Sequence, residues 1–312
     1  MKRSHLVTFV GVVIALAAGG FLVRAIVDQW AGVRSSIGNA SPAWLVAGAL
    51  TAAAGMVAIA LPWRTALALV GIRVGIAATV VWYFVGEIGK YLPGGVWPVV
   101  GRAELARGGG NPRSSAYASV ALSLGALYLT AVMLCGLLLP LRFAGSAREV
   151  LWILPLAPIG LAMLHPRVLN RLLGVAERVR KAKFPVEVPN WSASMRLLLR
   201  YVPSWLLIGT ATWFIARAFD PRLSWTTVAP AAICSWVIGF VLVPVPGGVG
   251  VREAAFVALI GGSVPSGTRA TIAIAARLSF MLVDGTGALL CSIALRRWRA
   301  ARVLERDAPA AL

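Results

Sequence analysis

Two copies of one short motif place charged side chains inside long apolar tracts. The first copy, GKYLPGGVWPVVGRAE, occupies residues 89–104, and the second, GFVLVPVPGGVGVRE, occupies residues 239–253. Each combines a Pro-Gly-Gly-Val segment, which breaks a helix, with an Arg and a Glu that hydrocarbon should reject. Hydrophobic segments interrupted by Gly and Pro at matching places in two halves of a chain indicate a transporter's binding site.

The candidate substrate-binding residues are the helix breakers of both motifs and the charged side chains in or near the same tracts. They are Glu87, Lys90, Pro93, Gly94, Gly95, Arg102, Glu104, Pro246, Gly247, Gly248, Arg252, Glu253, Arg277 and Asp284. Charges inside a membrane are costly unless paired or hydrated, so this set predicts a polar cavity at mid-depth that takes a charged headgroup. The cations suit phosphate, and the carboxylates suit balancing those cations or binding a coupling proton.

Backbone groups extend the same prediction. Glycines let backbone N–H groups approach a ligand, and half-helices beginning at Val96 and Val251 would direct their positive N-terminal ends toward the midplane. Glu87 and Lys90 are three residues apart and share a helix face.

A structural role is the alternative for each group. Arg102 and Glu104 would then end a half-helix at the cytoplasmic interface, whereas Arg252–Glu253 and Glu87–Lys90 would be structural pairs. The aromatic residues near the motifs are more typical of packing or interfacial anchoring than of ligand stacking. They are Trp82, Tyr83, Trp97 and Trp236.

Composition requires these residues to be positioned by membrane helices. The chain has 312 residues, of which 59% are hydrophobic and 13% charged, with a mean hydropathy of +0.82. Several tracts are long enough to cross about 30 Å of hydrocarbon, and none shows the alternation of a barrel strand. The fold class is therefore an all-α polytopic membrane protein. The net charge is +19, and most of the basic residues flank the apolar tracts. This placement indicates cytoplasmic loops and not nucleic-acid binding.

Charge distribution decides how the interrupted tracts run. Expected full spans cover residues 6–27, 43–61, 117–139, 150–164, 201–219 and 271–295, and the interrupted tracts cover 76–106 and 228–260. If both tracts turn back, most Lys and Arg fall on one side, whereas if both cross, the two sides share them about equally. The positive-inside rule favours the first arrangement. It predicts six spans and two re-entrant hairpins, with both termini cytoplasmic.

The domain organisation follows as two inverted-topology repeats, residues 1–140 and 141–300, with a cytoplasmic tail at 301–312. The cytoplasmic basic loop at 165–200 contains RVLNRLLGVAERVRKAK, which fits an interfacial amphipathic helix or a plain connector helix. The N-terminal apolar run is longer than a signal-peptide core, so we expect an uncleaved span. Cys135, Cys234 and Cys291 lie in apolar tracts without metal-ligand spacing, and we expect free thiols and no disulfide.

Motifs of known enzymes are scarce. The sequence has no Gly-x-Ser-x-Gly elbow, no P-loop and no histidine cluster, so we expect no catalytic residue, no metal and no cofactor.

The stretches EIGKYLPGGVWPVVGRAEL and PVPGGVGVREAAF resemble the lysylphosphatidylglycerol synthase transmembrane family, also called flippase-like. The resemblance implies lipid translocation without the soluble aminoacyl-transferase domain that some larger relatives carry, and re-entrant hairpins at residues 92–104 and 245–253.

We therefore expect a flippase, in a prokaryotic inner membrane, for a phospholipid or a polyprenyl-phosphate-linked sugar. The partners would be that anionic lipid and the bilayer, with homo-oligomerisation left open. A membrane transferase with Glu87 or Glu253 as base, and a non-transporting accessory subunit, are the alternatives. Lipid identity, transport direction and energy source stay open.

Overall fold

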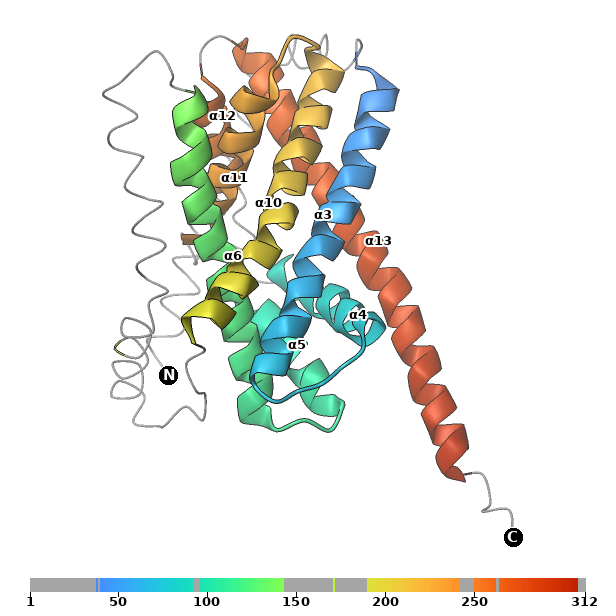
Figure 1. Ribbon diagram of the computed structural model, residues 1–312. Coiled ribbons are helices and arrows are strands. Elements are labelled where there is room, and N and C mark those ends of the chain that lie inside the picture. The colour runs from blue at the N-terminus through green and yellow to red at the C-terminus, as the bar shows by residue number, and fades with distance from the viewer. Residues whose placement is uncertain are drawn as a thin grey trace, which may run out of the picture.

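The protein is a bundle of α-helices (Figure 1). The computed structural model describes residues 38, 40–91, 96–142, 171, 190–241, 250–261 and 264–307. The helices are α3 (Pro42–Leu69), α4 (Ile76–Glu87), α5 (Trp97–Gly108), α6 (Arg113–Arg142), α10 (Trp191–Phe219), α11 (Trp225–Val241), α12 (Val251–Ile260) and α13 (Ser266–Asp307), with a 3-10 helix, η1 (Ile88–Tyr91). No strand occurs among these residues, so the predicted all-α class is confirmed for them.

Three of these helices are long and apolar enough to cross a membrane: Pro42–Leu69, Arg113–Pro140 and Ser266–Trp298. Large apolar side chains are exposed on their outer faces, for example Leu50 at 67% and Leu282 at 66%. Soluble proteins rarely expose large apolar surfaces to water, whereas membrane proteins expose them to the lipid tails. The chain is a membrane protein.

The interrupted tract at residues 76–106 forms two short helices packed against each other. Each of α4 and α5 has 12 residues, about 18 Å, which is too short to cross a bilayer. The helices approach through two glycines, because a Cβ on Gly101 would lie 3.0 Å from Gly86 Cα and 3.1 Å from Gly86 O. Figure 1 shows both helices in the lower half of the bundle, with α5 leading to α6 at the lower end.

Replacing Gly86 with alanine is expected to destabilise the protein by about 1–3 kcal/mol. The new Cβ would lie 2.7 Å from the backbone nitrogen of Arg102, which cannot yield without moving α5. Thermal unfolding in detergent measures the effect. Gly125→Ala in α6 is the matched control, because its Cβ meets nothing within 4 Å and alanine favours a helix by roughly 0.5–1 kcal/mol. Equal behaviour of the two variants would contradict the tight crossing.

The second interrupted tract forms a corresponding pair at the other end of the bundle. α11 runs from the upper end toward the middle, and α12 leads back up to the start of α13 (Figure 1). Gly250, the residue before α12, has a φ of +79°, a backbone conformation that favours glycine. The two short-helix pairs thus occupy opposite halves of the bundle.

Basic side chains gather at the lower end. α3 ends there, α6 and α10 begin there, and the last turns of α13 extend beyond it (Figure 1). In the described residues, the arginines near these helix ends are Arg64, Arg73, Arg107, Arg113, Arg196, Arg200, Arg296 and Arg297. The upper end has fewer, among them Arg222 and Arg269.

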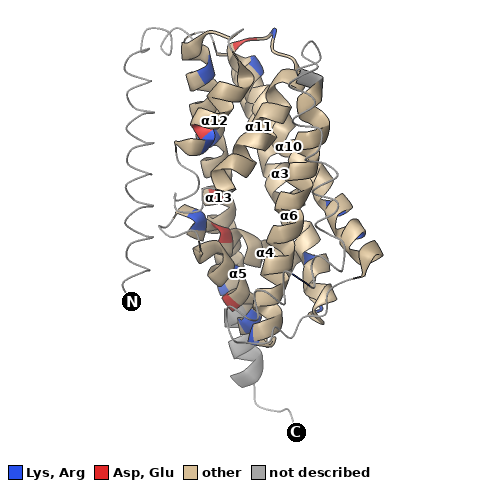
Figure 2. Ribbon diagram, turned by 90° about the vertical axis from the view of Figure 1, so that its left-hand side faces the viewer, with Lys and Arg blue, Asp and Glu red and all other residues tan. Residues whose placement is uncertain are grey.

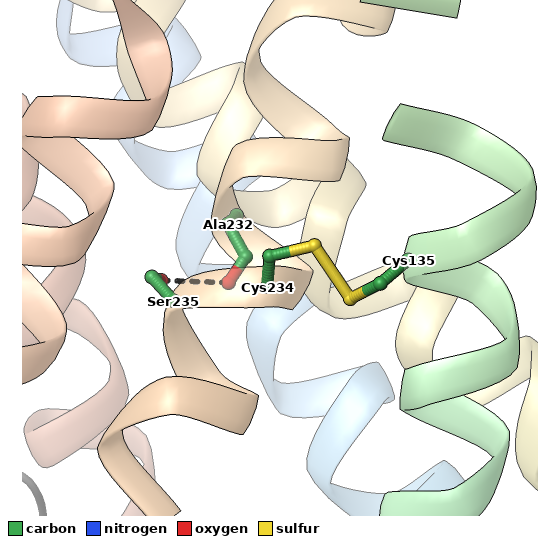
Figure 3. Close-up of a disulfide and its surroundings, with 4 residues drawn as sticks. All are labelled: Cys135, Ala232, Cys234 and Ser235. Carbon is green, nitrogen blue, oxygen red and sulfur yellow. Dashed lines mark hydrogen bonds between the residues drawn. A yellow bond between two sulfur atoms is a disulfide. The ribbon is translucent and has the colours of Figure 1, made fainter. Parts of the chain in front are cut away.

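One expectation about the cysteines is wrong. Cys135 on α6 and Cys234 on α11 form a disulfide, with their Cα atoms 5.8 Å apart (Figure 3). Sequence spacing did not reveal it, because the two positions are 99 residues apart and become neighbours only when α6 packs on α11. Cys291 is a free thiol, as expected. The bond ties the first helix of the upper pair to α6.

Two helices extend beyond their predicted limits. α10 begins at Trp191, inside the predicted basic loop 165–200, because the Asn190 side chain caps it by accepting from Ala193 N–H at 2.9 Å. α13 continues to Asp307, inside the predicted tail, since its charged end is rich in the helix formers Arg and Ala. The expected spans at 6–27 and 150–164 lie outside the described residues, as does almost all of the predicted amphipathic helix at 167–183.

Candidate functional site

Charged side chains converge where the two short-helix pairs meet the middle of α13. Figure 2 shows charged positions not only at the two ends of the bundle but also between them, beside α12 and α13. The lower group consists of Glu87, Lys90, Tyr91, Arg102 and Asp284, and the upper group consists of Arg252, Glu253 and Arg277.

Asp284 anchors the tip of the lower pair to α13. Its Oδ2 atom lies 2.6 Å from Lys90 Nζ and accepts a hydrogen bond from the Tyr91 hydroxyl, also at 2.6 Å. Asp284 is 2% exposed as a whole residue, and its other carboxylate oxygen, Oδ1, has no hydrogen-bond partner among the described residues. Glu87 lies further from the same ammonium group, at 3.8 Å.

Arg102 is enclosed within the lower pair. It is 1% exposed, its Nε lies 3.9 Å from Glu87 Oε2, and it donates to Pro98 O at 3.4 Å. The guanidinium also lies over the rings of Trp63 and Tyr83, at 5.6 and 5.5 Å. Its Nη2 atom has no hydrogen-bond partner among the described residues. These contacts place a positive charge deep in the bundle with one long ion pair.

Glu253 joins the upper pair to α13 and caps its own helix. Its Oε1 atom lies 3.2 Å from Arg277 Nη1, and its Oε2 accepts from the backbone N–H of Gly250 at 2.6 Å. A carboxylate in the first turn also suits the positive end of a helix. One buried side chain therefore fixes both the start of α12 and its attachment to α13.

Arg252 differs from its neighbours because no described carboxylate forms an ion pair with it. Its guanidinium stacks on Trp236, 3.6 Å from the ring centroid, and lies 5.4 Å from the Phe280 ring. Trp236 meets Trp205 and Phe280 edge to face, which fixes the platform. The indole Nε1 of Trp236 is buried without a partner among the described residues.

A small pocket opens beside Arg252. Arg252 and Glu253 line it together with Thr212 and Ser235. Both hydroxyls donate to carbonyls of their own helices, at 3.0 and 2.7 Å, so their lone pairs can accept hydrogen bonds from a ligand (Figure 3 for Ser235).

The two groups are joined by α13 with opposite polarity. The lower pair supplies the cation Lys90 to a carboxylate of α13, whereas the upper pair supplies the carboxylate Glu253 to a cation of α13. Arg277 and Asp284 are seven residues apart, about 10 Å along a helix. Tyr91 lies within electrostatic range of both Arg252 and Arg277. The groups therefore form one continuous charged cluster.

Residues 8–283 match the family model described as the lysylphosphatidylglycerol synthase TM region. The chain belongs to this family. The resemblance inferred from the two motifs is confirmed for this membrane region, and membership indicates a function connected with membrane lipids. No curated protein matches the chain. The matched region ends directly before Asp284.

The remaining predicted site residues fall outside the cluster or outside the described residues. Glu104 lies toward the lower end, where it pairs with Arg107 at 2.7 Å and Arg113 at 3.6 Å and accepts from the Tyr117 hydroxyl at 2.9 Å. The helix breakers of both motifs lie outside the described residues: Pro93, Gly94, Gly95, Pro246, Gly247 and Gly248. The described residues contain no group of three or more His, Cys, Asp or Glu suited to a metal ion.

Tyr91 and Trp236 were not predicted as site residues. Tyr91 directly follows Lys90 in the first motif, so its place in the motif was the available signal. Trp236 was assigned to packing, and its stacking against Arg252 depends on α11 meeting α12. Their contacts cross between helices, which residue spacing within one helix does not encode.

Proposed function

We propose that the protein translocates an anionic lipid, a phospholipid or a polyprenyl-phosphate-linked sugar, across the membrane. The headgroup binds the charged cluster on α13 while the apolar tails stay in the bilayer. The observation that carries this proposal is the charge balance of the cluster. Four cations, Lys90, Arg102, Arg252 and Arg277, face three carboxylates, Glu87, Glu253 and Asp284, and Arg252 is the cation without a described carboxylate partner.

Burial strengthens the argument from charge. An uncompensated cation inside a membrane protein is costly, and intramembrane charges commonly mark a substrate path. A phosphate oxygen would compensate Arg252, because a guanidinium donates two parallel hydrogen bonds to phosphate. Trp236 Nε1, which has no hydrogen-bond partner among the described residues, belongs to the ring under Arg252 and offers a further donor.

The arrangement of the short helices supports alternating access. In our proposal, α4–η1–α5 and α11–α12 are re-entrant hairpins from opposite leaflets, related as inverted repeats within a six-span body. The arginine-rich lower end faces the cytoplasm, as the positive-inside rule requires, in a prokaryotic inner membrane. Each hairpin then closes the cluster to one side, through Lys90 for the lower hairpin and Glu253 for the upper.

Reconstitution tests this proposal. Purified protein is placed in vesicles whose inner leaflet carries a trace of fluorescent anionic lipid, and the fraction reached by an external quencher is followed over time. We expect that fraction to rise faster than in protein-free vesicles. Mass spectrometry of the same lipid distinguishes the alternatives: a new chemical species identifies a transferase, and neither movement nor modification favours an accessory subunit.

A further inference from the structure

We propose that Asp284 is the proton-binding residue that couples lipid translocation to a pH gradient, with one proton moving alongside each lipid. This inference rests on the proposed function and adds its energy source. The starting observation is that Asp284 is both buried and unevenly bonded. Oδ2 forms an ion pair with Lys90 and accepts a hydrogen bond from Tyr91, whereas Oδ1 has no hydrogen-bond partner among the described residues.

The ion pair with Lys90 can be exchanged for a lipid phosphate. Lys90 belongs to the hairpin tip and is 18% exposed at its side chain, whereas the Asp284 side chain is 1% exposed. A phosphate oxygen arriving at the tip therefore meets the ammonium group first and competes with Oδ2 for it. Once Lys90 has moved to the phosphate, Asp284 is a buried carboxylate whose remaining close donor among the described residues is the Tyr91 hydroxyl.

A buried carboxylate that loses its cation becomes neutral by taking up a proton. That proton comes from water on the side from which the lipid entered. It binds Oδ1, where it breaks no hydrogen bond with a described residue. When the headgroup leaves on the opposite side, Lys90 returns to Oδ2 and the proton is released there. A phosphodiester with one negative charge then crosses together with one positive charge, so the cycle is electroneutral.

The groups around Asp284 agree with a single proton site. Its own helix carries Arg277, two turns away, and no hydrogen bond or ion pair from α3 or α10 reaches it among the described residues. The titratable and charged groups that neighbouring elements direct toward the cluster are Lys90 and Tyr91 of η1, Tyr83 and Glu87 of α4, Arg102 of α5, and Arg252 and Glu253 of α12. Glu87 and Glu253 keep cations of their own during the exchange, which leaves Asp284 as the carboxylate that changes charge.

The test uses vesicles of phosphatidylcholine with a trace of fluorescent phosphatidylglycerol, which carries one negative charge. Acidifying the labelled side by one pH unit should enrich the label on the other side by up to about tenfold at equilibrium. A membrane potential set with potassium and valinomycin should have no effect. The asparagine side chain of the Asp284→Asn variant cannot bind the proton. Transport by this variant should therefore be independent of the pH gradient and should depend on the membrane potential. Asp220→Asn, the same change in the upper loop beside Arg222, should behave as the wild type does.

A binding measurement separates this inference from the proposed function. In weak buffer with a pH indicator, phosphatidylglycerol binding to detergent-solubilised protein should take up about one proton per protein, and none in Asp284→Asn. Proton uptake without transport would overturn translocation and retain Asp284 as the proton site. Transport that ignores the pH gradient, or an Asp284→Asn variant that still takes up a proton on binding, would overturn the coupling.

Discussion

Replacing Arg252 with alanine is expected to slow lipid translocation by about 10- to 100-fold while leaving the fold intact. The estimate follows from the loss of a hydrogen bond to a charged group, worth about 1.5–3 kcal/mol. The fold should survive because Arg252 carries no ion pair with a described residue and contacts Trp236 and Phe280 through their ring faces. Initial rates in reconstituted vesicles measure the first effect, and thermal unfolding in detergent measures the second.

Two further variants make the result specific. Arg252→Lys keeps the charge but loses the planar fork, so its rate should fall between those of the wild type and the alanine variant. Arg222→Ala removes an arginine paired with Asp220 in the upper loop and should leave translocation unchanged. An Arg252→Ala variant that transports at the wild-type rate would remove Arg252 from the proposed site.

The sequence motifs predicted where helices are interrupted, because proline and glycine act through the local backbone. Half-helices were expected to begin at Val96 and Val251, and in the structure Val96 is the N-cap of α5 and Val251 begins α12. The clustering of the charges was also predicted from their place in the apolar tracts. A single sequence shows both where proline and glycine interrupt a helix and where charged residues lie in apolar tracts.

The partners of those charges could not be predicted in the same way. Spacing along one helix suggested that Glu87 pairs with Lys90, yet the closer partner of Lys90 is Asp284, at 2.6 Å against 3.8 Å. That partner lies on α13, far away in sequence, and it is selected by how α13 packs against α4, where Phe84 fits over Gly287. The disulfide between Cys135 and Cys234 escaped prediction for the same reason. Tertiary packing, and not local spacing, decides these pairs.

The second large effect concerns the ion pair that attaches α12 to α13. Replacing Glu253 with alanine is expected to cost about 3–5 kcal/mol of stability, because the change removes one partner of a largely buried ion pair. Gly250 N–H also loses its acceptor, Glu253 Oε2. Unfolding of the full-length protein in detergent should show the loss directly.

A double variant shows whether the loss of stability comes from the interaction between Glu253 and Arg277. Glu253→Ala with Arg277→Ala should lose less than the sum of the two single losses, since each single variant already breaks the ion pair between them. Additive losses would mean that the two side chains stabilise the protein independently. Coupling of this kind would show that the Glu253–Arg277 pair itself attaches α12 to α13. It would also agree with a Glu253 that keeps its cation while Asp284 exchanges Lys90 for a proton.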